Sequence, residues 1–270
     1  MTQQSKSHGR KSISANSQPR ALMTQSPQLA GVWTAQILTL FPEAFPGVLG
    51  ESLTGRALKD GKWALDTIDL RLFGEGKHRN VDDTPAGGGA GMVLKPNVVG
   101  AALDRALAQQ KAPLPMVCLS PRGTPFTQAK ARAWANAGGV TMLCGRFEGI
   151  DQRVIDHYQL EEVSLGDFVL TGGEIAAQAM IDATVRLLPD ILGNEASIAE
   201  ESHMAGLLEH PHYTRPALWN GRSIPDVLQS GHHINIAKWR REMSQQVTKE
   251  KRPDLWAAFQ NALGKPDPKD

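Results

Sequence analysis

The chain has 270 residues, of which 41% are hydrophobic, which is enough for one large or two modest globular domains. Its formal net charge of +1 argues against a polycation that binds nucleic acid along its whole length. No uninterrupted apolar segment approaches the roughly 18 residues that span a bilayer, so we expect no membrane segment. The two cysteines, Cys118 and Cys144, each close an apolar run without metal-like spacing. This favours buried, reduced thiols and an intracellular compartment.

Residues 1–31 differ from the rest in composition. They contain four basic residues and no Asp or Glu, are rich in Ser and Gln, and show neither helical nor strand periodicity. A transit peptide would share this composition, but a disordered extension is the simpler prediction.

From residue 32 to residue 192, short apolar runs alternate with helical patterns. Strands are predicted at 35–41, 63–72, 116–119, 140–144 and 163–170. Helices are predicted at 47–58, 96–110, 127–137, 151–158 and 174–188. Because strands that alternate with helices build parallel sheets, we expect an α/β domain with a mostly parallel sheet.

The C-terminal part follows a different pattern. Residues 193–206 are polar and acidic and read as a linker, and residues 207–270 show helical patterns only, which predicts a small helical domain. Six of its basic residues cluster between 236 and 252 around Trp239, against two glutamates. Such a cluster suits a phosphate backbone and a stacked base, although a solvated helix face has the same composition.

Three predicted strands end in small residues. These ends are Ser120–Gly123, Gly145–Gly149 and Thr171–Glu174. Ligands of open α/β sheets bind outside the carboxyl ends of the strands, and glycines there let the backbone approach a ligand closely. The sequence therefore predicts one glycine-lined pocket at these three ends.

Other motifs allow two readings. The run Gly87–Gly91 lacks the rest of a phosphate-binding motif, so it is either a flexible loop or a ligand contact, and Asp82 beside it is either a turn former or a contact to a base or metal. Glu148 and Glu174 are either carboxylates at helix N-termini or functional groups. Arg186, in an apolar stretch, either snorkels to solvent or points into a pocket.

The segment 210–216 holds two histidines but no cysteine partner and no pair of histidines at i, i+4 spacing. A structural turn is therefore expected there in place of a metal site.

Six motifs together resemble one family, the bacterial tRNA (guanine-N1)-methyltransferases of the TrmD family. They are LFPEAF (40–45), VDDTPAGGGAGM (81–92), LSP (119–121), GRFEGID (145–151), GDFVLTGGE (166–174) and PHYTRP (211–216). They keep the family's order and spacing over about residues 33–260. The resemblance implies methyl transfer from S-adenosyl-L-methionine to N1 of the guanine immediately 3′ of the tRNA anticodon.

The family also implies an architecture. Its members have the knotted SPOUT methyltransferase fold, an α/β domain with a deep trefoil knot near its C-terminal strands, which no pattern argument would predict. They act in the cytoplasm as homodimers with composite active sites. The expected division is therefore an extension at 1–31, a knotted domain at 32–192, a linker at 193–206 and a tRNA-binding helical domain at 207–270.

The resemblance assigns twelve positions to the cofactor. Adenine and ribose would meet Leu119, Ser120, Pro121, Gly145, Ser164, Leu165, Gly166, Leu170, Gly172 and Gly173. Glu148 would lie beside the methionine moiety, and Gly149 is assigned to the same site.

Catalysis in the family uses an arginine and an aspartate. Arg186 matches the arginine that stabilises charge on guanine O6, and Glu201 stands at the position of the aspartate that removes the N1 proton. Because this position departs from the family pattern, Glu200 becomes a rival base. Ala86 is a second departure, since relatives often carry an aromatic ring there. A magnesium requirement is also associated with the family, without a site in this sequence.

The remaining assignments concern RNA. Asp82 would help to read the target base or its neighbour, and the anticodon stem-loop would be held by His212, Lys238, Arg240 and Arg241. Two alternatives stay open: a knotted methyltransferase for another RNA, and an RNA-binding protein that keeps the cofactor pocket but turns over weakly.

Overall fold

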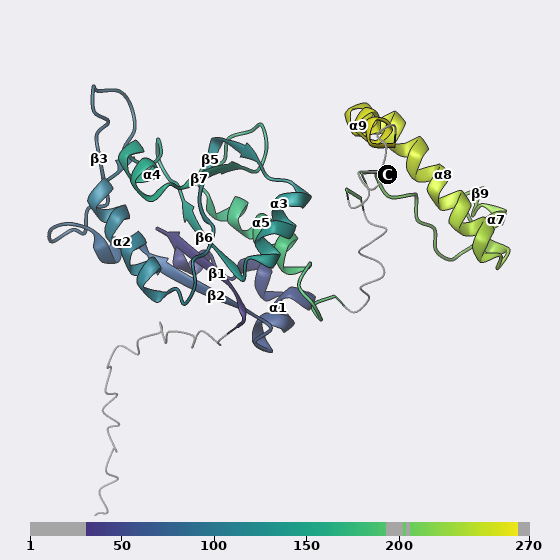
Figure 1. The fold of residues 1–270 in the computed structure, drawn as a ribbon, viewed down its shortest axis with the longest axis horizontal. Helices are drawn as coiled ribbons and strands as arrows, with labels where there is room; N and C mark the ends of the chain where they lie inside the picture. The colour runs from purple at the N-terminus through teal and green to yellow at the C-terminus, as the bar shows by residue number, and fades with distance from the viewer. Residues whose placement is uncertain (1–30, 193–201, 204–205, 264–270) are drawn as a thin grey trace, which may run out of the picture.

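A five-stranded sheet organises the N-terminal domain of the computed structural model, which describes residues 31–192, 202–203 and 206–263 (Figure 1). Its order is β2-β1-β6-β5-β7, and every neighbouring pair is parallel. The strands are β1 (Trp33–Thr39), β2 (Trp63–Asp69), β5 (Met116–Pro125), β6 (Gly139–Cys144) and β7 (Glu161–Ser164). The predicted α/β class and parallel sheet are confirmed.

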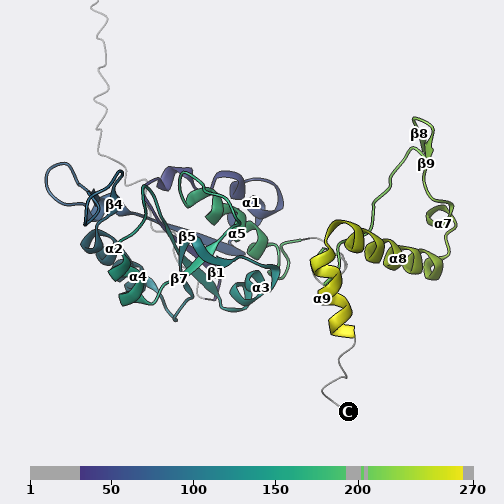
Figure 2. The same cartoon turned by 90° about the horizontal axis from the view of Figure 1, so that it is seen from above.

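Helices cover both faces of this sheet (Figure 2). They are α1 (Ser52–Lys59), α2 (Pro96–Gln109), α3 (Gln128–Asn136), α4 (Gln152–Tyr158) and α5 (Glu174–Val185), with 3₁₀ turns η1 (Pro42–Ala44), η2 (Gly47–Gly50) and η3 (Leu70–Phe73). Successive strand residues point to opposite faces, and β1 shows the result. Ala35 and Ile37 pack in the cluster of α1, α3 and α5, whereas Leu38 packs in the cluster of α2 and α4.

Two predicted strands end earlier than their apolar patterns suggest. The strand predicted at 63–72 ends at Asp69, whose side chain accepts a hydrogen bond from Arg71 N and starts η3. The strand predicted at 163–170 ends at Ser164, because its hydroxyl bonds to Gly166 N and O and turns the chain there. Residues 168–170 are apolar but lie in a loop.

The strand predicted at 116–119 is longer than its apolar run. It continues to Pro125 through an irregularity after Leu119, and then Thr124 and Pro125 pair with Val163 and Ser164 of β7. This polar extension has no apolar alternation, so periodicity could not reveal it.

A short hairpin interrupts the predicted loop at 79–91. It joins β3 (Asp82–Asp83) to β4 (Val93–Leu94) in antiparallel pairing.

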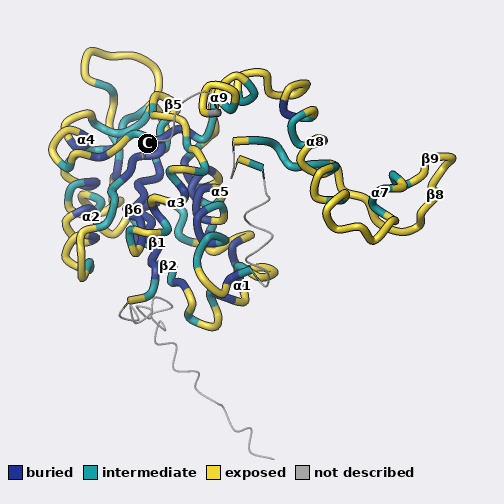
Figure 3. Tube along the Cα trace, turned by 45° about the vertical axis from the view of Figure 1, so that its right-hand side comes forward, coloured by how far each residue is buried: buried dark blue, intermediate teal, exposed yellow. Residues whose placement is uncertain are grey.

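The C-terminal part contains α7 (Asp226–Gln229), α8 (His233–Lys251) and α9 (Pro253–Leu263), as the helical patterns predict. It also contains a hairpin of β8 (Leu218–Trp219) and β9 (Arg222–Ser223), so the expectation of helices alone was wrong. Positive φ values at Asn220 and Gly221 close this hairpin with the Asn-Gly turn that favours it. Most of the C-terminal backbone is exposed, whereas the sheet is buried (Figure 3).

Candidate active site

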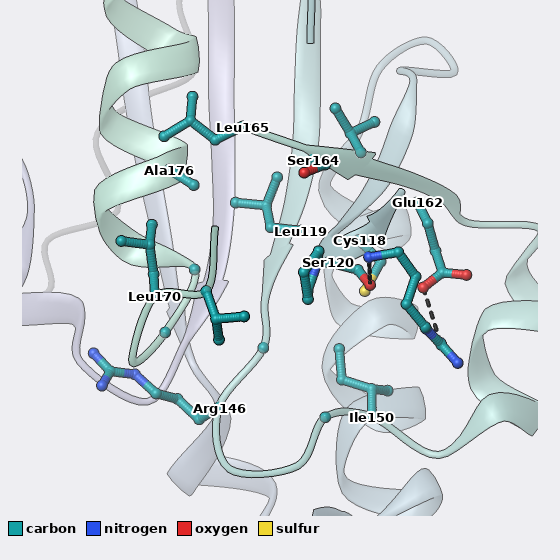
Figure 4. Close-up of a pocket in the computed structure, with 18 of the residues that line it drawn as sticks. Cys118, Leu119, Ser120, Arg146, Ile150, Glu162, Ser164, Leu165, Leu170 and Ala176 are labelled. Carbon is teal, nitrogen blue, oxygen red and sulfur yellow. Dashed lines mark hydrogen bonds and ion pairs between the residues drawn. The ribbon is translucent and has the colours of Figure 1, made fainter. Parts of the chain in front are cut away.

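A cavity of about 450 Å³ opens at the carboxyl ends of β5, β6 and β7 (Figure 4). Eleven of the twelve predicted cofactor positions line it, namely Leu119, Ser120, Pro121, Gly145, Glu148, Gly149, Ser164, Leu165, Leu170, Gly172 and Gly173. The structure thus brings together residues that span more than fifty positions of the chain. Their role toward a cofactor stays a prediction.

Gly166 is the exception, since it does not line the cavity. It lies behind Phe168, and a Cβ atom at this position would meet the Phe168 ring at 2.7 Å. Phe168 is itself part of the cavity wall. Glycine at this position therefore leaves room for the Phe168 ring.

The predicted meeting of three chain ends is confirmed, although the third end is reached differently. Leu119 pairs with Cys144 of β6 and with Val163 of β7, so these strand ends are adjacent. The glycines of the 171–174 segment follow a loop and not a strand. They still reach the same place, because Gly173 N donates to Gly145 O at 3.0 Å.

The glycine run at 87–91 reaches the cavity at one end. Glu148 N donates to Met92 O at 2.9 Å, and a Cβ atom at Gly91 would lie 2.3 Å from the Glu148 side chain. Added Cβ atoms at Gly87 to Gly89 would meet no described atom within 4 Å. Gly91 thus lies against a residue of the cavity wall without lining the cavity itself, and a ligand contact of the run stays a prediction.

Three charged residues of the cavity wall, Arg122, Arg146 and Glu162, had no role predicted from the sequence. Arg122 follows the family motif LSP, and its Nη2 lies 2.9 Å from an oxygen of Glu162 on β7. The same nitrogen donates to Gln152 Oε1 at 3.3 Å, which ties the loop after Leu119 to α4. Arg146 also lines the cavity. The available signals were the position of both arginines shortly after predicted strands and the place of Arg146 in the motif GRFEGID.

Glu174 lies at a helix N-terminus, as the first of its two readings predicts, but its oxygens contact side chains and not the free amides of the helix. It begins α5, is only 3% exposed, and accepts a hydrogen bond from Thr39 Oγ1 at 2.7 Å. Its other oxygen lies 2.8 Å from Arg146 Nη2. The carboxylate is thus an internal anchor behind the cavity.

Both cysteines are buried free thiols, as predicted. Burial, with the Glu162 carboxylate nearby, raises the pKa of Cys118 to about 12. Burial likewise raises the pKa of Cys144 well above its ordinary value. Cys118 therefore lines the cavity as a neutral, weakly polar group.

Arg186 does not line this cavity. The helix predicted at 174–188 ends at Val185 in the structure, and Arg186 is its C-cap. The cavity lies at the other end of α5, beside Gly173 and Ala176. A helix of this length separates its ends by roughly 18 Å. Glu201 and its rival Glu200 lie outside the described residues.

The predicted RNA contacts lie on two other parts of the chain. Asp82 forms β3, while Lys238, Arg240 and Arg241 are exposed on α8, where Lys238 pairs with Glu242 at 3.9 Å. The exposed His212 ring lies 2.9 Å from Glu209.

The segment 210–216 packs on α8 through rings. The rings of His210 and Tyr213 lie 6.2 Å and 6.1 Å from that of Trp239. The segment thus packs against α8, and its residues, all of them described, form no hydrogen-bonded turn, only a bend at Arg215.

In the described part of the chain, no group of three or more His, Cys, Asp or Glu side chains is arranged to hold a metal ion. None of the helices in that part combines the length and apolarity that crossing a membrane requires.

Comparison with known proteins supplies the family. Residues 34–258 match the model of tRNA (Guanine-1)-methyltransferase TrmD. A "tRNA (guanine-N(1)-)-methyltransferase" of Ruegeria sp. is 64% identical over 238 residues, which cover 88% of this chain and 98% of the relative. Proteins of the same name from Cereibacter sphaeroides and Brucella suis are 65% and 55% identical, each over 88% of this chain and 96% of the relative. With its cavity residues in the motifs of that family, the chain belongs to the TrmD family of tRNA (guanine-N1)-methyltransferases.

Proposed function

We propose that this protein transfers a methyl group from S-adenosyl-L-methionine to N1 of the guanine immediately 3′ of the tRNA anticodon, giving 1-methylguanosine. The observation that carries the proposal is the cavity at the ends of β5, β6 and β7, lined by the motifs of a tRNA methyltransferase family. The substrate implies action in the cytoplasm, where tRNA serves in translation.

The cavity suits S-adenosyl-L-methionine in size and in chemistry. Its volume of about 450 Å³ falls in the range of small-molecule sites. Apolar side chains such as Leu119, Leu165 and Leu170 suit the purine, whereas the hydroxyls of Ser120 and Ser164 suit polar groups. When bound, the cofactor supplies an electrophilic methyl group on its sulfonium.

The chain's own residues would activate the base. Guanine N1 carries a proton at neutral pH, so a carboxylate must remove it before N1 becomes nucleophilic. We assign this step to Glu201, with Glu200 as the rival. Charge then grows on O6, where the guanidinium of Arg186 would stabilise it. Asp82 would orient the target base or its neighbour.

A homodimer is part of the proposal, because a single chain separates Arg186 from the cavity by the length of α5. A contiguous face of η2, α1 and α5 supports it. Thr54 Oγ1 donates to Asp182 at 3.2 Å on this face, and Val48, Leu53 and Ile175 leave 70%, 48% and 63% of their surface exposed. Exposed apolar groups of this kind mark interfaces.

The trefoil knot remains a proposal that the topology supports. The extension of β5 passes along β7 as far as Ser164, and the chain after Ser164 then returns to Gly145 at the end of β6. In a knotted connection, the chain would pass through the loop of an earlier connection on this return.

We further propose that residues 193–206 link the knotted domain at 32–192 to a tRNA-binding domain at 207–270. Lys238, Arg240 and Arg241 on α8 would contact the phosphates of the anticodon stem-loop, and His212 would contribute beside them. The described residues do not fit a dedicated magnesium site, so no step is assigned to that ion.

Replacing each candidate base by its amide tests the mechanism. Glu201→Gln should abolish methylation of tRNA while leaving the dissociation constant for S-adenosyl-L-methionine unchanged, since the cavity is untouched. Glu200→Gln should retain activity. The reverse pattern would move the base to Glu200. A parent chain that does not bind the cofactor would contradict the proposal as a whole.

A further inference from the structure

An arginine lies directly behind the glycine turn of the cavity wall. Arg146 follows β6, and its side chain runs outward beside the turn that follows Leu170 (Figure 4). Its Nη1 donates to Thr171 O at 3.3 Å. Its backbone also forms a bridge with Gly172. The arginine, itself part of the cavity wall, therefore holds the turn at Thr171 and Gly172 in place.

The guanidinium is fixed from two further directions. It lies 4.4 Å from the centre of the Phe41 ring, which gives a cation–π contact. It also pairs with Glu174, whose carboxylate is held in turn by Thr39 at the end of β1. Removing the cation from a buried carboxylate strongly destabilises the folded state. The ion pair therefore favours a single position of the guanidinium.

The side chain of Arg146 occupies the space that a side chain at position 172 would need. A Cβ atom there would lie 2.1 Å from Arg146 Nε and 2.4 Å from its Cζ, which is far inside van der Waals contact. Gly172 is not among the residues with positive φ, so its backbone does not itself require glycine. The Cβ direction leads into the guanidinium. Arg146 Nε is buried there without a hydrogen-bond partner among the described residues.

We infer that Arg146 is a positioning residue for the cofactor turn, and that position 172 is glycine to admit the guanidinium and not the ligand. The inference deepens the proposed function, on which it rests for the identity of the ligand. Its consequence is that Gly172 and Arg146 act as one unit. A methyl group at position 172 should displace the turn only while the guanidinium occupies the space behind it.

A double-mutant cycle measures this dependence. The dissociation constant of S-adenosyl-L-methionine is determined by calorimetry for the full chain and for Gly172→Ala, Arg146→Ala and the double variant. Each single change should weaken binding about tenfold or more, because a displaced turn misplaces several contacts at once. The double variant should bind within about twofold of Arg146→Ala, because the methyl group then fills vacated space.

Losses that multiply in the double variant, or wild-type affinity in Gly172→Ala, would overturn the inference. Failure of the parent chain to bind would instead contradict the proposed function. Arg153→Ala is the matched control, since this exposed arginine pairs with Asp151 at the surface and lies outside the cavity wall. Its affinity should equal that of the parent.

A third variant covers the case in which Arg146→Ala fails to fold. Glu174→Gln keeps the size of the anchor and its bond from Thr39 but removes the charge that holds the guanidinium. It should weaken cofactor binding severalfold at temperatures where circular dichroism shows it folded. A lower melting temperature with unchanged affinity would show a merely structural pair and overturn the inference.

Discussion

Arg186 is the residue on which the proposed chemistry depends most. It lies at the C-terminal end of α5 and not in the cavity wall, so it should act on the guanine and not on the cofactor. We expect Arg186→Ala to lower kcat by about 10²–10³-fold, the usual cost of losing one charge-stabilising donor. Cofactor affinity by calorimetry should stay unchanged. An equal loss in affinity would show that Arg186 supports the cavity instead.

The buried thiol of Cys118 makes stability depend on alkaline pH. Because its pKa is raised to about 12 in the folded state, the unfolded state loses this proton first as pH rises. The folded protein then binds more protons than the unfolded one, so stability falls from about pH 9 upward. Melting temperatures of the parent and Cys118→Ala between pH 8 and pH 11 test this. The parent should lose more stability over that range, and equal losses would contradict the assignment.

At the scale of residues, the sequence located the cavity wall but not the charges behind it. Leu119, Gly145 and Gly173 could be found because small residues after apolar runs mark strand ends. The ion pair of Arg146 and Glu174 could not, since it joins positions 28 apart in sequence through side-chain directions that no pattern records.

Among the elements, the extension of β5 packs along β7 beside the cavity. Gly123 lies against β7 so closely that a Cβ atom would fall 2.3 Å from Val163 N and 2.4 Å from Glu162 C. Gly123→Ala should therefore separate the two strands and lower the free energy of unfolding in urea by about 2–4 kcal/mol.

Gly145→Ala is a steric control for that prediction. Its added Cβ would make only ordinary contacts, the nearest at 3.5 Å from Leu119 O. Its unfolding midpoint should stay close to that of the parent. Equal midpoints for Gly123→Ala and the parent would show that the extension of β5 can move away from β7.

Helices and strands could be predicted where apolar residues recur at the spacing of one buried face. The helix at 96–109 and the strand at 139–144 were found almost to the residue, because their apolar patterns match one face of a helix or a doubly covered strand. The loop at 165–171 was predicted as strand because it carries an apolar run. Its apolar side chains line the cavity in place of a sheet face, and Val169 is 82% exposed. A ligand site and a strand can show the same apolar run.

At the scale of the whole molecule, the account requires two chains at each active site. Two inactive variants can be combined to test this. Arg186→Ala leaves the cavity intact but removes the arginine, whereas Ser120→Trp fills the cavity but keeps Arg186. Each homodimer should be inactive. A heterodimer of the two, purified through separate tags after coexpression, keeps one intact cavity facing an intact Arg186 of the other chain. It should regain about half of the parent activity. An inactive heterodimer would place both parts of a site in one chain.

The assembly was the least predictable level. Composition and periodicity yielded an α/β domain followed by helices, but a knot and a composite site depend on how the chain threads and pairs with a copy, which periodicity does not encode. Here the resemblance in six motifs supplied the expectation. The length of α5 between Gly173 and Arg186 is the observation that supports the proposed second chain.

Single-turnover methyl transfer tests the central claim most directly. Labelled S-adenosyl-L-methionine and excess full-length protein are mixed with a tRNA transcript that carries guanine 3′ of the anticodon, or with a matched transcript that carries adenine there. The account predicts transfer to the first transcript alone, with 1-methylguanosine recovered after digestion. Transfer to neither, with the cofactor demonstrably bound, would contradict it and favour a different RNA substrate or a binding protein.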